Sequence, residues 1–159
     1  MTSTVAPLSR RTPWHLWVLG ILNLLWTAMG SFDFIMTNTQ GDAWLRQSDM
    51  TDAQIATYHA MPLWMMVAWA VGVFGGLLGS ILLLLRKRLA VPVLALSFVG
   101  AILSQAPEML DAQFRAAMGS YAFMGIGIML WALLIALYAW AMSRRGVLGQ
   151  RPGPAYAFN

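Results

Sequence analysis

Long apolar stretches alternate with short polar segments along the chain. Four of them are long enough to cross a bilayer as a helix, which needs about 20 residues; they lie at about residues 14–36, 61–85, 89–107 and 117–142. This pattern predicts an all-α integral membrane protein in which residues 1–159 form one domain, a four-helix bundle. The flanking segments 1–12 and 146–159 are predicted to be mobile tails, because they lie outside the spans.

The connectors between the spans carry their own signals. Thr51 and Gln54 form the pattern of a capping box, which predicts a short helix that runs through Tyr58 into the second span. Trp44, earlier in the same connector, either belongs to an ordinary connector at the membrane interface or covers a cleft as a lid. Pro107 is expected to end or kink the third span, because proline removes a helical hydrogen bond. A short acidic link then leads to the fourth span.

Basic residues are distributed unevenly between the two ends of the spans. Eight of the ten Lys and Arg residues fall on one side: Arg10, Arg11, Arg86, Lys87, Arg88, Arg144, Arg145 and Arg151. Arg46 and Arg115 fall on the other side, and all six acidic residues lie on that side or near it. Because cytoplasmic loops carry the excess of Lys and Arg, both termini are predicted to be cytoplasmic and the short helix extracytoplasmic.

Composition excludes several classes of function. Apolar residues make up 59% of the chain and charged residues 10%, whereas soluble domains average about 25% charged residues. This excludes a soluble enzyme and a DNA-binding domain, so we expect a lipid bilayer and no nucleic acid as a partner. The chain has no cysteine, and its two histidines, His15 and His59, are predicted on opposite sides of the membrane. We therefore expect no cofactor and no metal, and no enzyme activity because no nucleophile and base can be paired.

Polar side chains at membrane depth form two stripes, on the first and third spans. Within each stripe the residues fall within an arc of about 120° on a helical wheel. Two such stripes could face each other and line a polar cleft; the residues are Asn23, Thr27, Asp33, Ser97, Ser104, Gln105 and Glu108. The alternative is that the two carboxylates simply reach the aqueous boundary, since each lies near the end of its span.

Tryptophans and glycines inside the spans also allow two interpretations. Trp26, Trp69 and Trp131 lie deep, where they could form a stacking wall for a ring-shaped solute or pack against small residues. Small residues four apart on the second span let another helix approach closely; they are Gly72, Gly75, Gly76 and Gly79. That helix could belong to the same chain or to a second copy.

Part of the sequence resembles a known family. The stretch LLWTAMGSFDFIMT at residues 24–37, the motifs PLW at 62–64 and AWA at 68–70, and the run at 75–92 carry the resemblance. They are similar to small bacterial four-helix inner-membrane proteins that are often labelled sugar transporters. The resemblance implies a bacterial inner-membrane location, and it singles out Trp26, Asp33, Pro62, Trp64 and Trp69.

Two functions remain open at this point. The first is a transporter of a neutral polar solute such as a sugar, indicated by the polar stripes, the deep tryptophans and the resemblance. Four helices are few for alternating access, so it would need to form a homodimer. The second is a non-enzymatic accessory or assembly subunit of a larger membrane complex, indicated by short loops and small-residue packing faces.

Overall fold

The computed structural model describes residues 12–119 and 121–149, with the backbone alone for residues 121–123. Every regular element in these residues is a helix, which confirms the predicted all-α class. Four long helices are apolar enough to cross a membrane, as predicted: α1 (Trp14–Gln40), α4 (Leu63–Leu84), α5 (Ala90–Leu110) and α7 (Tyr121–Arg144). Three short helices lie between them: α2 (Asp42–Gln47), α3 (Asp52–His59) and α6 (Ala112–Met118).

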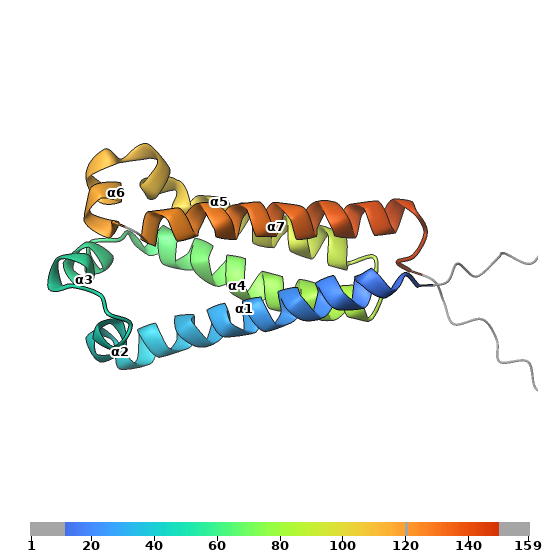
Figure 1. Cartoon of the computed structure of the whole chain (residues 1–159), viewed down its shortest axis with the longest axis horizontal. Coiled ribbons are helices and arrows are strands. Elements are labelled where there is room, and N and C mark those ends of the chain that lie inside the picture. Colours follow the sequence, from blue (N-terminus) through green and yellow to red (C-terminus); the bar gives the residue numbers. More distant parts are fainter. Residues whose placement is uncertain (1–11, 120, 150–159) are drawn as a thin grey trace, which may run out of the picture.

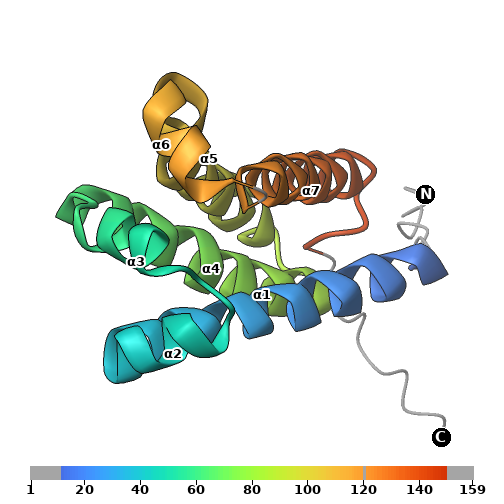
Figure 2. The same ribbon diagram turned by 60° about the vertical axis from the view of Figure 1, so that its left-hand side comes forward.

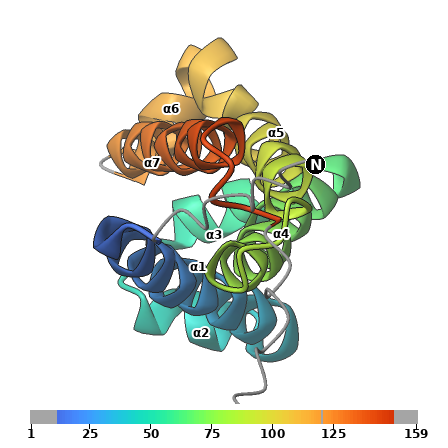
Figure 3. The same ribbon diagram turned by 90° about the vertical axis from the view of Figure 1, so that its right-hand side faces the viewer.

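The four long helices run alternately up and down and form a bundle (Figure 3). Helix α4 packs against both α1 and α5, and α5 packs against α7, whereas α1 and α7 share no comparable backbone packing. Figures 1 and 2 show α1 and α7 diverging toward the end that carries α2, α3 and α6. We name that end the connector end. The opposite end carries Arg86, Lys87, Arg88, Arg144 and Arg145, and we name it the basic end.

The apolar core lies toward the basic end, where all four long helices meet. Leu16 of α1, Leu83 of α4 and Ile135 of α7 are at most 1% exposed. Leu148 is equally buried and Val147 is 6% exposed, so the predicted mobile tail does not begin at residue 146. The chain reverses at Gly146 (φ +71°), and these two apolar side chains fold back onto the core. Residues 150–159 of that tail, and residues 1–11 of the other, lie outside the described residues.

Helices α4 and α5 approach closely because small residues face each other across their contact. A Cβ atom built on Gly100 would lie 2.7 Å from the backbone nitrogen of Gly72 and 2.8 Å from the carbonyl oxygen of Ala68. Gly75 and Gly79 likewise face Ser97 and Leu94 of α5. Gly76 instead faces Thr27 of α1. The second-span glycines therefore pack against helices of the same chain.

The connectors are more helical than the sequence predicts. The capping box is present, since Thr51 and Gln54 each accept from the other's backbone N–H, but α3 ends at His59 instead of continuing into α4. Pro62 is the N-cap of α4 and separates the two helices. Helices α2 and α6 were not predicted at all.

Three predicted span boundaries are wrong. Helix α1 continues to Gln40, whereas the first span was predicted to end at about residue 36. Pro107 lies inside α5, which continues to Leu110, so it does not end that helix; the other predicted effect, a kink, stays a prediction. The fourth long helix begins at Tyr121 and not at residue 117, because residue 117 belongs to α6, which is terminated by Gly119 with φ +59°. Asp111 caps α6 by accepting from the backbone N–H of Gln113 and Phe114, which is why a helix forms in the predicted link.

Candidate functional site

A cavity of about 680 Å³ lies between α1 and α7, where these helices diverge. Its walls come from α1, α4, α5 and α7, and residues of the first connector close part of its connector-end side. Six of the seven predicted cleft residues line it, together with all three deep tryptophans: Asn23, Thr27, Asp33, Ser97, Ser104, Gln105, Trp26, Trp69 and Trp131. The cavity thus gathers polar and aromatic residues from separate helices.

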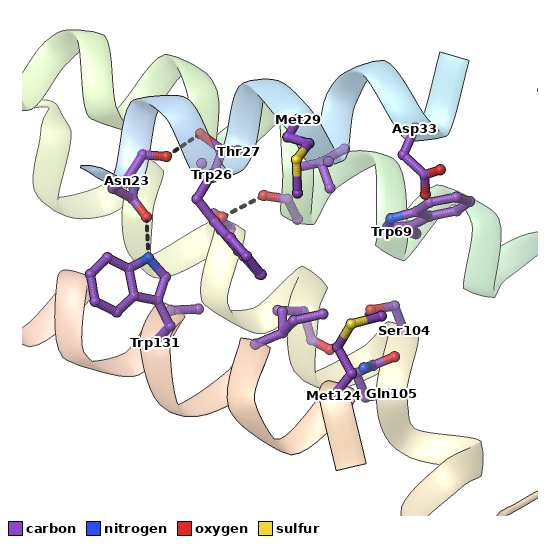
Figure 4. A pocket seen from close by; sticks show the side chains of 18 of the residues that line it. Asn23, Trp26, Thr27, Met29, Asp33, Trp69, Ser104, Gln105, Met124 and Trp131 are labelled. Atoms are coloured by element: carbon purple, nitrogen blue, oxygen red, sulfur yellow. Dashed lines mark hydrogen bonds between the residues drawn. The ribbon is translucent and has the colours of Figure 1, made fainter. Parts of the chain in front are cut away.

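A hydrogen-bond network forms the floor of the cavity toward the basic end. Asn23 is 3% exposed; its amide nitrogen donates to Ser80 Oγ at 2.7 Å, and its carbonyl oxygen accepts from Trp131 Nε1 at 2.9 Å. Ser80 Oγ donates in turn to the carbonyl oxygen of Gly76 at 2.7 Å. Figure 4 shows Asn23 and Trp131 joined across the space between α1 and α7. This network ties three helices together and satisfies the indole N–H.

The hydroxyl groups along the walls donate to nearby backbone oxygens. Ser97 Oγ donates to the carbonyl of Gly72 at 2.6 Å, Thr27 Oγ1 to that of Asn23 at 2.7 Å, and Ser104 Oγ to that of Ala101 at 3.0 Å. Serine and threonine commonly make such bonds within helices. Their donors are therefore already used, and the remaining walls are mainly aromatic and aliphatic, including Met29 and Trp26. Figure 4 shows Trp26 projecting from α1 toward α7.

In the part of the chain that the structure describes, Asp33 provides the one charged group that lines this cavity. It lies seven residues before the end of α1, or about 10 Å along the helix axis. Its Oδ1 accepts from Trp44 Nε1 at 2.8 Å, whereas Oδ2 has no hydrogen-bond partner among the described residues. The Trp44 ring also packs edge to face on Phe32, with ring centroids 5.7 Å apart. These contacts hold α2 over the cavity, as expected if Trp44 covers a cleft.

The charge of Asp33 affects the pKa of Tyr58, a residue of α3. Burial raises the pKa of Tyr58 above its ordinary value of 10.0, and the negative charge of Asp33 raises it further. The phenol is therefore neutral over the ordinary pH range. Its buried hydroxyl has no hydrogen-bond partner among the described residues.

Glu108 does not share the cavity with Asp33, contrary to the predicted cleft. It lines a second cavity with Met109 and Arg115, and Gln105 alone of the predicted cleft residues contributes to both. The reason is the direction of the Glu108 side chain: a Cβ on Gly125 of α7 would lie 2.6 Å from its Oε2. Gly125 thus leaves room for the carboxylate against α7, away from α1.

The three deep tryptophans do not form one stacking wall. Trp131 belongs to the hydrogen-bonded floor, whereas Trp69 packs edge to face on Phe34 with centroids 4.8 Å apart. In Figure 4, Trp69 and Asp33 lie toward one end of the cavity and Trp131 toward the other. A ligand of the cavity would therefore contact separate aromatic groups along its length.

Of the lining residues other than the predicted cleft residues and the deep tryptophans, Trp44 was predicted only as one of two alternatives, and the others were not predicted from the sequence. Trp44, Ser48 and Met50 reach the cavity from the first connector, and Met29 and Met124 line it from α1 and α7. The sequence signal for Trp44 was its position: it is a tryptophan in an otherwise polar connector, and it follows a span that contains the acidic residue Asp33. The methionines carry no such signal, because they resemble ordinary apolar positions.

Comparisons with protein-family models, with curated proteins and with solved structures found no match to this chain. Function is therefore inferred from the geometry of the cavity and from the chemistry of its lining residues. Among the described residues, no group of three His, Asp or Glu side chains could hold a metal ion.

Proposed function

We propose that the chain is a multi-pass protein of the bacterial inner membrane that binds a small molecule between α1 and α7 and carries it across the bilayer. In this proposal the basic end faces the cytoplasm together with both termini, because Lys and Arg are retained on that side. The connector end then faces outward, and the cavity takes up its ligand from there.

The cavity between α1 and α7 is the observation that supports this proposal. Its volume of about 680 Å³ lies within the range of about 300–1,000 Å³ that is typical of small-molecule sites. Its lining also matches such sites, since a few polar groups are set among aromatic and aliphatic side chains. A charged residue such as Asp33 is costly at membrane depth and usually serves a function there.

The accessory-subunit alternative accounts for the same opening in another way. The gap between α1 and α7 would then receive a helix of a partner protein, with Trp26 and Met29 as contacts. The two functions make different demands on the purified protein. A carrier binds its ligand as the chain alone or as a homodimer, whereas an accessory subunit copurifies with a foreign protein in fixed stoichiometry.

Cavity-filling variants test the carrier in reconstituted vesicles. Ala132→Phe adds an aromatic ring inside the cavity, whereas Leu134→Phe adds one on an exposed position of the same helix that does not line it. We expect protein-dependent uptake of radiolabelled glucose or tetraphenylphosphonium to fall at least tenfold in Ala132→Phe and to stay within twofold in Leu134→Phe. Uptake that is equal in the two variants, or absent with both solutes, would contradict the proposed carrier.

A further inference from the structure

We infer that the cavity between α1 and α7 selects a lipophilic organic cation, and not a neutral sugar, with Asp33 as its counter-ion. This inference rests on the proposed function, because it names the class of molecule that occupies the same cavity. Three features support it: the charge of the lining, its aromatic groups and the hydrogen bonds already made within it.

The charge of the lining has one sign. Within residues 12–119 and 121–149, Asp33 is the only ionisable group that lines the cavity, and no Lys, Arg or His side chain of that part does so. Its Oδ1 is occupied by Trp44, and its Oδ2 has no partner among the described residues. A carboxylate in surroundings of low polarity strongly favours an opposite charge. A ligand cation beside Oδ2 would provide that charge.

Aromatic groups surround the path from Asp33 into the cavity. Trp44 and Trp69 line its connector-end part, and Trp26 projects into the space farther along α1 (Figure 4). The electron-rich faces of tryptophan rings attract cations, above all quaternary ones that cannot be hydrogen-bonded. Methionine side chains such as Met29 and Met124 adapt to apolar groups of different shapes. The lining therefore suits a cation with apolar or aromatic substituents.

The charges outside the cavity favour the same class of ligand. All six acidic residues of the chain lie in the connector-end half, against two arginines. Arg46 is already paired with Asp52 at 2.9 Å, so it does not neutralise Asp33. Such an excess of one sign raises the local concentration of ions of the other sign and speeds their association.

A sugar would find fewer free partners in this cavity. The hydroxyls of Thr27, Ser97 and Ser104 donate to backbone oxygens, and Asn23 is engaged by Ser80 and Trp131. These hydroxyl oxygens can still accept a hydrogen bond, but they have no donor left for a sugar oxygen, so the wall replaces only part of the hydrogen bonding that a sugar has in water. Of these residues, Ser97 and Asn23 join helices, whereas Thr27 and Ser104 bond within their own helices.

Equilibrium binding of tetraphenylphosphonium to the purified full chain in lipid nanodiscs tests the inference. We expect saturable binding that weakens at least tenfold in Asp33→Asn. The amide oxygen that this substitution introduces can still accept from Trp44, so the variant keeps the local structure while it loses the charge. Asp49→Asn removes the same charge from an exposed position that does not line the cavity, and we expect it to bind within twofold of the parent chain.

Neutral probes separate failure of this inference from failure of the proposed function. Triphenylphosphine oxide has a similar apolar body without the charge, and glucose represents the sugars; both are expected to bind at least tenfold more weakly than the cation. Tighter binding of either neutral probe, or equal cation binding by Asp33→Asn and the parent chain, would overturn the cation inference and leave a binding cavity in place. Binding of none of the three probes would contradict both.

Discussion

Replacing Gly100 with alanine is expected to cause the largest loss of stability of any single methyl group added to this chain. A Cβ at this position would lie 2.7 Å from Gly72 N and 2.8 Å from Ala68 O, and real Cβ atoms essentially never approach within 3.0 Å. Both neighbours are backbone atoms, so α4 and α5 must move apart. Overpacking of this kind costs about 1–3 kcal/mol, and separated helices also lose their van der Waals contacts.

Thermal unfolding in mild detergent, followed through tryptophan fluorescence, measures this loss. Gly127→Ala is the matched control, because the same change on α7 meets no atom within 4 Å. We expect the control to be neutral or slightly stabilising, since alanine favours helix more than glycine by about 1 kcal/mol. Equal unfolding temperatures for the two variants would show that α4 and α5 do not touch at Gly100.

Asn23→Leu is expected to destabilise the bundle by about 1–3 kcal/mol, the usual cost of leaving a buried polar group without its partner. Asn23 joins Ser80 of α4 to Trp131 of α7, and leucine fills a similar volume without either bond. The Trp131 N–H then faces an apolar wall. Because this network forms the floor of the cavity, we also expect the separation of α1 and α7 to increase.

A double-mutant cycle isolates the Asn23–Trp131 bond in the same unfolding assay. Trp131→Phe removes the indole donor, so adding Asn23→Leu to it should cost less than Asn23→Leu alone. The difference is expected to be about 0.6–2 kcal/mol, the range measured for hydrogen bonds between membrane helices. Strictly additive effects would mean that the two side chains do not interact.

The four spans could be predicted from the sequence because the bilayer requires long apolar runs, and such runs are visible without any tertiary information. Helix ends were harder to predict. Pro107 lies three residues before the end of α5. A proline disturbs the turn that precedes it, through its missing N–H and its ring, so the residues after Pro107 can still continue the helix. Helices α2 and α6 are short, and contacts with other elements stabilise them; Gln54 of α3, for example, donates to the carbonyl of Met118 at the end of α6.

The cavity was predictable in part, because polar residues on one face of a span indicate a shared direction. That reasoning identified Asn23 and Asp33 but misplaced Glu108, since a helical wheel does not show which neighbouring helix offers room. The room for the Glu108 carboxylate is left by Gly125, which lies on another span. The polar solute inferred from the stripes stays a prediction, and the binding of glucose and tetraphenylphosphonium tests it.

The burial of Leu148 illustrates a third limit. Residues after the last span look like a free tail, because the turn at Gly146 and the polar residues around it resemble a chain end. In the structure, Arg88 Nε donates to the carbonyl oxygen of Leu148 at 3.3 Å, and the N–H of Gly149 donates to that of Arg86. Val147 and Leu148, two apolar residues outside the spans, thus pack on the core at the basic end.

Cysteine accessibility in native membranes tests the central claim, that water reaches the space between α1 and α7 from the connector end. The chain has no cysteine of its own, so single cysteines report one position each. Ser104→Cys lies in the cavity, Ile102→Cys lies on an exposed apolar face of the same helix, and Lys87→Cys marks the basic end. A membrane-impermeant methanethiosulfonate should modify Ser104→Cys in spheroplasts but not Ile102→Cys, and Lys87→Cys only in inverted vesicles. Equal protection of Ser104→Cys and Ile102→Cys in spheroplasts would contradict an open cavity.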